Sequence, residues 1–259
     1  MPCLQQQKIL WVCNMEKQKR VLVTGASRGI GRGIAIALAE DGYEVILHCA
    51  TGVQKAEEVK SIIEQAGGKA IILTADLRDP TCAKAMAQQM GDVDMLILNA
   101  AIQMKKPWQE IALEEANAQI NCNFLSSLAL IQEAVPYMKT QKWGRIITIG
   151  SVQEAKPHPD MLVYSSMKAA QTAMVKSLSL QLAKDGITVN NVAPGVVRTD
   201  RNSVDLEDPA YAKKVTDSIP VGFYGTAEDC AGIVSLLCSE KGRYITGQSI
   251  FVDGGKSVQ

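Results

Sequence analysis

The sequence predicts one α/β domain, in which helices cover both faces of a doubly wound parallel sheet of about seven strands. Two observations predict this fold class. From Arg20 onward, short β-rich runs alternate with longer amphipathic runs, and most of the short runs are nearly continuous Val, Ile and Leu, as in strands covered on both faces. No internal repeat, linker or break in composition divides the 259 residues, a length compatible with a single large domain.

The expected elements alternate along the chain, which implies right-handed crossovers between parallel strands. The runs that predict strands are 20–24, 44–48, 70–74, 95–98, 145–149, 188–192 and 249–252. The longer runs that predict helices are 30–41, 53–66, 81–90, 112–139, 161–185 and 226–239. Pro80 and Pro159 near expected starts, and Gly67 and Gly186 just past expected ends, support these boundaries.

The composition is that of an ordinary globular protein, and it excludes several other classes. The chain has 27 basic and 27 acidic residues, with 47% hydrophobic and 21% charged residues. Such a chain can bury enough apolar surface to fold, which excludes intrinsic disorder. Balanced charge without a basic stripe argues against nucleic-acid binding. No apolar run approaches the ~20 residues that a membrane-spanning helix needs, so no membrane partner is expected.

The seven cysteines predict neither a metal site nor a disulfide framework. Their number is odd, and no two of them form a CxxC pair. Reduced thiols are therefore expected, as in a cytoplasmic protein.

Residues 1–14 do not match the pattern of the rest of the chain. Their apolar stretch, residues 9–13, is too short for the core of a signal peptide, and no small-residue cleavage site follows it. We hypothesise that Met15 is the biological start, so that residues 1–14 are an upstream extension and residues 15–259 form the domain. The alternative is a genuine amino-terminal arm, and the intact mass of the natural protein distinguishes the two.

A glycine-rich turn, TGASRGIG at residues 24–31, joins the first expected strand to the first helix. A strand that turns sharply into a helix presents free backbone N–H groups and the positive end of the helix dipole, which suit a pyrophosphate. Gly25 permits the tight turn, and Gly29 and Gly31 allow close approach of phosphates and of the sheet. The spacing differs from the commoner GxGxxG, but its position after the first strand predicts a nucleotide site.

The end of the second strand favours NADP over NAD. In this fold an acidic residue there binds the ribose hydroxyls of NAD, whereas a basic residue accommodates the 2′-phosphate of NADP. Residues 48–51 read HCAT, and the first acidic residue is Glu57. Arg28 in the glycine-rich turn is a candidate ligand for the 2′-phosphate. We therefore expect NADP(H) as the preferred cofactor, with NAD(H) as the alternative.

Candidate catalytic residues follow the fifth strand, at the sheet edge where open α/β sheets bind ligands. Ser151 comes directly after this strand, and Tyr164 and Lys168 follow in the sequence YSSMK. On a helix, their i, i+4 spacing puts Tyr164 and Lys168 on one face. A YxxxK pair alone has little weight, because chance supplies it in many amphipathic helices. Ser151 at a strand end and Asn123 in the preceding long helix strengthen the interpretation.

Together these motifs resemble those of the short-chain dehydrogenase/reductase family, whose fold is a single Rossmann-like domain. The resemblance runs from about Arg20 to Gly255. The motifs that carry it are TGASRGIG at 24–31, Asp76, Asn99-Ala100, Asn123, Ser151, Tyr164, Lys168, NNVAPG at 190–195 with Thr199, YITG at 244–247 and VDGG at 252–255.

The resemblance implies hydride transfer between a nicotinamide and a secondary alcohol or carbonyl. Tyr164 would exchange a proton with the substrate oxygen, and Lys168 would bind the nicotinamide ribose and lower the pKa of Tyr164. Ser151 would hydrogen-bond the reacting oxygen, and Asn123 would hold a water that links Lys168 to solvent. The expected cofactor-binding residues are Gly25, Ser27, Arg28, Gly29, Ile30, Gly31, His48, Asp76, Leu77, Asn99, Ala100, Ala101, Tyr164, Lys168, Pro194, Gly195, Val197 and Thr199.

The loop after Ser151 suggests a polar substrate. It reads VQEAKPHP and places Gln153, Glu154 and His158 near the expected crevice. A hydroxyl-rich substrate needs such donors and acceptors, whereas a steroid or a long acyl chain prefers aliphatic walls. This loop and the later segment 208–225 resemble the sugar dehydrogenases of the family, particularly the glucose type. The alternative is that these polar residues form only a solvated rim.

Two other functions stay open. The 3-oxoacyl-(acyl-carrier-protein) reductases of the family dock an acidic carrier on basic residues, and at the matching places this chain has Lys142 but also Asp185. A catalytically silent NADP-binding regulator is the alternative from another class. The resemblance also implies a homotetramer built on the helices 112–139 and 161–185, for which ordinary core packing is the alternative. The expected partners are a small-molecule substrate and further copies of the chain.

Overall fold

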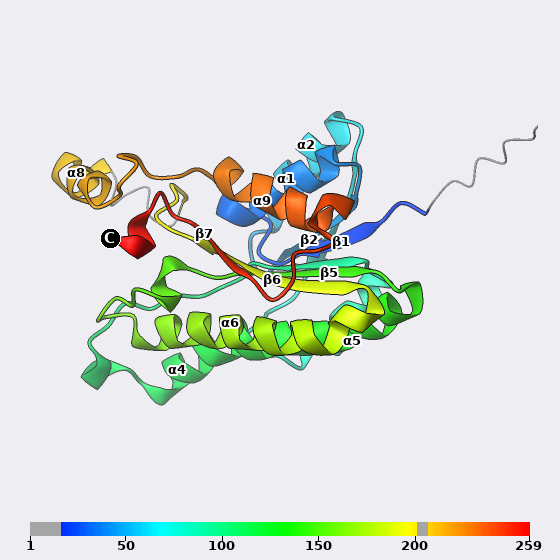
Figure 1. Ribbon diagram of the computed structural model, residues 1–259, viewed down its shortest axis with the longest axis horizontal. Helices are drawn as coiled ribbons and strands as arrows, with labels where there is room; N and C mark the ends of the chain where they lie inside the picture. The colour runs from blue at the N-terminus through cyan, green and yellow to red at the C-terminus, as the bar shows by residue number, and fades with distance from the viewer. Residues whose placement is uncertain (1–16, 201–206) are drawn as a thin grey trace, which may run out of the picture.

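A single parallel sheet forms the centre of the computed structural model, which describes residues 17–200 and 207–259 (Figure 1). Its order is β3-β2-β1-β4-β5-β6-β7, and all neighbouring strands are parallel. The order reverses between β1 and β4, the position where open α/β sheets bind ligands. The predicted fold class is confirmed. The strands are β1 (Arg20–Val23), β2 (Glu44–Cys49), β3 (Lys69–Thr74), β4 (Met95–Leu98), β5 (Gly144–Ile149), β6 (Ile187–Pro194) and β7 (Ser249–Val252).

Two layers of helices cover the sheet, one on each face (Figure 1). Side chains of β1 alternate between the two resulting cores. Val21 and Val23 belong to the core under α1 and α9, whereas Leu22 belongs to the core under α3, α5 and α6. The helices of the first layer are α1 (Gly29–Glu40), α2 (Val53–Gln65) and α9 (Ala227–Cys238), and those of the second are α3 (Cys82–Met90), α4 (Leu113–Ile120), α5 (Ser126–Gln141) and α6 (Leu162–Leu182).

The predicted helix over 112–139 is present, but it is not regular α-helix throughout. Between α4 and α5 the chain forms a π-helical turn, η2 (Asn121–Leu125). The fully buried Asn123 of this turn accepts a hydrogen bond from the Ile102 N–H and donates one to the Ile102 carbonyl, both at 2.9 Å. These bonds hold the wider turn against the loop after β4. Insertions of this kind occur frequently at functional sites.

One further helix, α8 (Pro209–Asp217), was not expected from the sequence. Its start has the usual signals, since Asp208 accepts a hydrogen bond from the Ala210 N–H at 2.9 Å and Pro209 occupies the first turn. The helix lies at one end of the molecule, near the carboxyl terminus (Figure 1).

Residues 1–14 and the hypothesised start at Met15 lie outside the described residues, so that hypothesis stays a prediction. Among the described helices, none combines the length and the apolar character that crossing a bilayer requires.

Candidate active site

Asn99 and Thr24 tie the carboxyl ends of β1 and β4 together at the point where the strand order reverses. The Asn99 amide donates to the carbonyls of Thr24 at 2.8 Å and Gly25 at 3.2 Å. The backbone N–H groups of Asn99 and Ala100 both donate to Thr24 Oγ1, at 2.9 and 3.0 Å. These four hydrogen bonds therefore fix the backbone at the carboxyl ends of β1 and β4.

The glycine-rich turn, residues 24–31 and hereafter the phosphate loop, is packed too tightly for side chains at its glycines. Gly25 and Gly29 adopt left-handed backbone conformations, with φ of +67° and +56°. A Cβ atom on Gly31 would lie 2.3 Å from the Gly25 carbonyl oxygen. Arg28, at the N-cap of α1, makes no side-chain capping bond. The amino end of α1 therefore has orphan N–H groups of the kind that bind phosphate.

His48 braces the phosphate loop from within the protein. Its side chain is 2% exposed, Nδ1 lies 3.2 Å from the Gly25 N–H donor, and Nε2 lies 3.1 Å from the Ala75 carbonyl. These partners require the neutral tautomer with its proton on Nε2, and burial lowers the pKa of His48 below its ordinary value of 6.5. Because both ring nitrogens are engaged, we assign His48 to the support of the loop rather than to direct cofactor contact.

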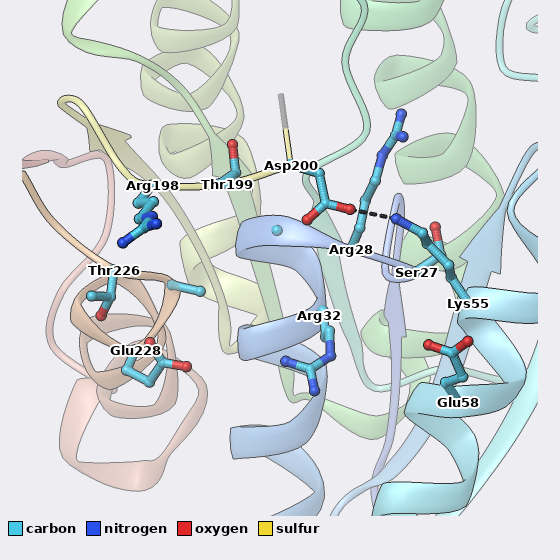
Figure 2. A pocket seen from close by; sticks show the side chains of 12 residues that line it. Ser27, Arg28, Arg32, Lys55, Glu58, Arg198, Thr199, Asp200, Thr226 and Glu228 are labelled. Atoms are coloured by element: carbon cyan, nitrogen blue, oxygen red, sulfur yellow. Dashed lines mark hydrogen bonds and ion pairs between the residues drawn. The ribbon is translucent and has the colours of Figure 1, made fainter. Parts of the chain in front are cut away.

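A cavity of about 440 Å³ opens beside the phosphate loop (Figure 2). Its sides are joined by an ion pair, in which Lys55 Nζ at the start of α2 lies 2.5 Å from the Asp200 carboxylate beyond β6. The hydrogen bond from Lys55 lowers the pKa of Asp200. The lining residues are Ser27, Arg28, Gly29, Arg32, Lys55, Glu58, Arg198, Thr199, Asp200, Thr226, Ala227 and Glu228. The described lining therefore holds four exposed cations against three exposed carboxylates, an excess of positive charge that suits an anionic ligand.

The other expected cofactor-binding residues differ in their contacts and in their burial. The Thr199 methyl lies 3.3 Å from where a Cβ on Gly29 would be, so the segment after β6 contacts the phosphate loop. Asp76 pairs with Arg78 at 2.5 Å, and this hydrogen bond lowers the pKa of Asp76. Among the remaining expected cofactor-binding residues, Leu77, Pro194 and Val197 are buried, whereas Ser27, Ile30, Ala101 and Gly195 are half-buried.

Tyr164 and Lys168 lie on the buried face of α6, with exposed fractions of 7% and 1%. The Lys168 ammonium is 5.5 Å from the centroid of the Tyr164 ring. It donates to the Ile149 carbonyl at 2.6 Å and to Gln171 Oε1 at 3.0 Å. Because Ile149 is the last residue of β5, the Lys168 ammonium is held at the end of that strand, two residues before Ser151.

Ser151 and Asn123 approach the same region from other elements. Ser151 follows β5 and accepts a hydrogen bond from the Gln153 N–H at 3.2 Å, which begins the short helix η3 (Val152–Glu154). Both η3 and η2, which contains Asn123, pack against α6. Next to Asn123, burial raises the pKa of the Cys122 thiol, which therefore stays neutral. The structure thus brings the elements of all four expected catalytic residues together.

The expected substrate residues are tied into the loop itself. Glu154 accepts hydrogen bonds on both carboxylate oxygens, from Asn191 Nδ2 at 2.9 Å and from Ser249 Oγ at 2.5 Å. We therefore assign Glu154 to anchoring η3 on β6 and β7 rather than to the substrate. Gln153 Oε1 accepts from the His158 N–H at 2.8 Å and from Ser165 Oγ at 2.9 Å. His158 is half-buried and remains a candidate substrate contact.

This arrangement fits a dinucleotide and does not include a metal site. The phosphate loop leaves backbone N–H groups uncovered, the cavity beside it carries cations, and a buried ammonium lies at the end of β5. Among residues 17–200 and 207–259, no group of three or more His, Cys, Asp or Glu side chains could hold a metal ion.

Comparison with known proteins decides the family. A family model described as enoyl-(acyl carrier protein) reductase matches residues 25–257, which include the phosphate loop and all four expected catalytic residues. This chain belongs to the short-chain dehydrogenase/reductase family. It is therefore an oxidoreductase that acts on CH–OH and carbonyl groups, and the resemblance predicted from the motifs is confirmed.

Three similar proteins carry the names of two different activities. The chain is 38% identical to the 3-oxoacyl-(acyl-carrier-protein) reductase of Staphylococcus aureus over 245 residues, which cover 93% of this chain and 99% of the relative. It matches a 3-oxoacyl (acyl-carrier-protein) reductase of Agrobacterium tumefaciens with NADP bound, at 32% identity and a TM-score of 0.88 over 95% and 99% of the chains. It also matches a protein from Beutenbergia cavernae described as an NAD(P)-dependent gluconate 5-dehydrogenase, with bound NADP, at 31% identity and a TM-score of 0.87 over 93% and 97%.

Sequence reasoning missed two residues that the structure places at the site. Lys55 lines the cavity, although only the acidic Glu57 was considered among the charged residues that follow β2. A cation in the first turn of the helix that follows β2 was the available signal. Gln171 bonds Lys168, and its i, i+3 spacing on the same helix was the signal in that case.

Proposed function

We propose that the protein is an NADP-preferring oxidoreductase that interconverts a secondary alcohol and a carbonyl in a small polar substrate. The observation that supports this most directly is the buried Tyr164–Lys168 pair beside Ser151. A bound nicotinamide supplies or accepts the hydride. Tyr164 Oη transfers the proton to or from the substrate oxygen, and Ser151 Oγ hydrogen-bonds that oxygen and orients it. Asn123 bonds Ile102 and so holds the turn that packs on α6, while its expected role in holding a water that links Lys168 to solvent stays a prediction.

Because Lys168 is buried, its positive charge can lower the pKa of the neighbouring Tyr164. Bringing a phenol from a pKa of ~10 to near 7 requires about 4 kcal/mol. An ammonium at ~4 Å supplies about that much at an effective dielectric constant near 20, but only ~1 kcal/mol in bulk water. Lys168 is 1% exposed, so its field at Tyr164 is little weakened by solvent.

The preference for NADP rests on the charges beside the phosphate loop. Arg28 and Lys55 offer cations to a 2′-phosphate, and no carboxylate occupies residues 48–51 at the end of β2 to bind the ribose hydroxyls of NAD. NADP in the two related structures agrees with this assignment.

A carboxylate beside the expected docking cation favours a small free substrate over a carrier-bound one. Lys142, the cation expected to dock an acidic carrier, pairs with Asp185 at 2.9 Å, and Lys139 lies 3.5 Å from the same carboxylate. These pairs lower the pKa of Asp185 and keep it ionised. Asp185 offsets part of the positive charge of the two lysines, so this surface attracts an acidic carrier less strongly than unpaired cations would. We therefore favour a sugar, polyol or other hydroxyl-rich compound.

The second candidate is an NADPH-dependent 3-oxoacyl-(acyl-carrier-protein) reductase. It is favoured by the 38% identity to such a reductase over nearly its whole length. A silent NADP-binding regulator is the third outcome of the same experiment.

The test follows NADPH oxidation and NADP reduction by absorbance at ~340 nm, a wavelength set by the nicotinamide chromophore. The substrates are a panel of aldoses, polyols and hydroxyketones on one side and a 3-oxoacyl thioester, free and carrier-bound, on the other. We expect Tyr164-dependent turnover of a polar substrate, with carrier-bound thioester poor until Asp185→Arg restores a docking cation. Glu64→Arg, which replaces an exposed ion-paired carboxylate on α2, is the matched control. Efficient turnover of the carrier-bound thioester by the unaltered protein contradicts the proposal, and turnover of nothing favours the regulator.

We also propose a homotetramer in the cytoplasm, as the family resemblance implies. The helices concerned still expose apolar side chains, including Leu113 at 77% and Leu180 at 83%. Light scattering that gives a monomeric mass at micromolar concentration contradicts the tetramer.

A further inference from the structure

Gln171 is a fully buried polar side chain whose two ends differ in their partners. It lies on α6, one turn after Lys168, and is 0% exposed. Its Oε1 accepts a hydrogen bond from the Lys168 ammonium at 3.0 Å. Its Nε2 is buried without a hydrogen-bond partner among the described residues. A buried donor left in this state destabilises a fold, so the amide requires an explanation beyond packing.

The Lys168 ammonium explains the amide oxygen. An ammonium can act only as a donor, and burial penalises its charged form unless acceptors surround it. Two acceptors of the ammonium are the Ile149 carbonyl at 2.6 Å and Gln171 Oε1 at 3.0 Å, both of them neutral. A neutral acceptor stabilises the ammonium without cancelling its positive charge, whereas a carboxylate at this place would cancel most of the field that reaches Tyr164.

Tyr164, Cys122 and Glu154 are titratable groups on the elements packed around Lys168. Tyr164 lies beside it on α6, and Cys122 faces it from η2 with a thiol that burial keeps neutral. From η3, which also packs on α6, Glu154 directs both carboxylate oxygens to Asn191 and Ser249.

We propose that Gln171 is a positioning residue, whose side-chain oxygen holds the charged Lys168 ammonium in place beside Tyr164. The inference rests on the proposed function, because it concerns the same acid–base pair. An apolar residue at 171 would fill the space and remove the unpaired Nε2, but it would also remove one of the acceptors of the buried ammonium.

The experiment measures the pH at which Tyr164 ionises, using the ultraviolet difference absorbance of tyrosinate in the protein saturated with NADP. Tyr164→Phe, titrated in parallel, identifies the contribution of Tyr164 among the six tyrosines. The variants are Gln171→Met, which has the same length without an acceptor, and Gln171→Glu, which adds a negative charge. Gln181→Met is the matched control, because Gln181 is an exposed glutamine of the same helix. Thermal melting verifies that each variant is folded.

We expect ionisation of Tyr164 to move to higher pH in Gln171→Met, by roughly 0.5–1 unit, since one charge-stabilising hydrogen bond is lost. Gln171→Glu should move it further in the same direction, and Gln181→Met should not move it. Ionisation that is lowered in the unaltered protein but unmoved in both Gln171 variants overturns the positioning role alone. Ionisation near the ordinary value of about 10 in the unaltered protein overturns the acid–base assignment as well.

Discussion

The cavity beside the phosphate loop and the region around Tyr164 contain charge in different settings. Every charged residue that lines the cavity is exposed: Arg28, Arg32, Lys55, Glu58, Arg198, Asp200 and Glu228. Around Tyr164, by contrast, Lys168 is 1% exposed and is held by neutral acceptors. Many exposed charges can recognise an anion without fixing its position closely, while one buried charge at a fixed position can shift the ionisation of its neighbour. The comparison suggests that the cavity selects the cofactor and that the buried pair performs the chemistry.

The largest expected effect concerns the buried Tyr164–Lys168 pair. Tyr164→Phe removes the hydroxyl that transfers the proton, so we expect kcat to fall by about 10²–10⁴-fold. The dissociation constant for NADPH should stay unchanged, because the exposed cavity is untouched. Steady-state kinetics and fluorescence titration with NADPH measure the two quantities. Turnover within a few fold of the unaltered protein would exclude Tyr164 as the acid–base.

The next largest effect concerns His48, the buried residue that supports the phosphate loop beside the exposed cavity. His48→Ala leaves the Gly25 N–H without its acceptor, which we expect to lower the free energy of unfolding by about 1–3 kcal/mol. His48 should also make stability depend on pH. Since its folded-state pKa lies below 6.5, the unfolded chain binds more protons between these two values, and stability falls as the pH drops through that window.

Urea unfolding near pH 7.5 and near pH 5.5 measures this dependence. His48→Gln is the informative control, because an amide can accept from Gly25 and donate to Ala75 without titrating. Its pH dependence should be shallower than that of the unaltered protein. Equal slopes would show that another group is responsible.

A smaller effect tests the cavity. Lys55→Gln removes one exposed cation, so we expect NADP to bind about threefold to tenfold more weakly and NAD to bind as before. Lys60→Gln is the matched control, since Lys60 lies on the same helix, is not among the residues that line the cavity, and pairs with Glu64 one turn further along. Equal loss of NADP and NAD affinity would mean that Lys55 does not recognise the 2′-phosphate.

The smallest effect has the opposite sign. Asp200 pairs with Lys55 and adds negative charge to the cavity, so Asp200→Asn should tighten NADP binding by about twofold to threefold. NAD binding, measured by the same titration, should not change. Weaker NADP binding would indicate that Asp200 holds Lys55 in position instead of competing with the 2′-phosphate.

The sequence was most informative where local pattern and global fold agree. Continuous Val, Ile and Leu runs identified the buried strands, because a strand covered on both faces has no polar side. The pattern also placed Tyr164 and Lys168 on one helix face. The π turn at Asn123 could not be predicted, since it depends on hydrogen bonds to Ile102 from a different part of the chain.

The roles of polar residues were harder to predict than their positions. His48 was expected to contact the cofactor because it lies at the end of a strand, and Glu154 was expected to contact the substrate because it lies in the polar loop after Ser151. Their partners, Gly25 with Ala75 and Asn191 with Ser249, come from elements distant in the sequence, and these contacts give both residues internal roles. Spacing along one chain indicates which edge of the sheet a residue reaches, but not whether its polar atoms are already satisfied there.

The most direct test of the account is the salt dependence of binding and of turnover, measured on one preparation. Raising the ionic strength from about 0.05 M to 0.5 M shortens the screening length and weakens exposed charges much more than buried ones. We predict that the dissociation constant for NADP rises several fold while kcat at saturating cofactor and substrate stays constant. A kcat that falls in parallel with NADP affinity would contradict the account, because the Lys168–Tyr164 pair would then be as exposed to solvent as the cavity.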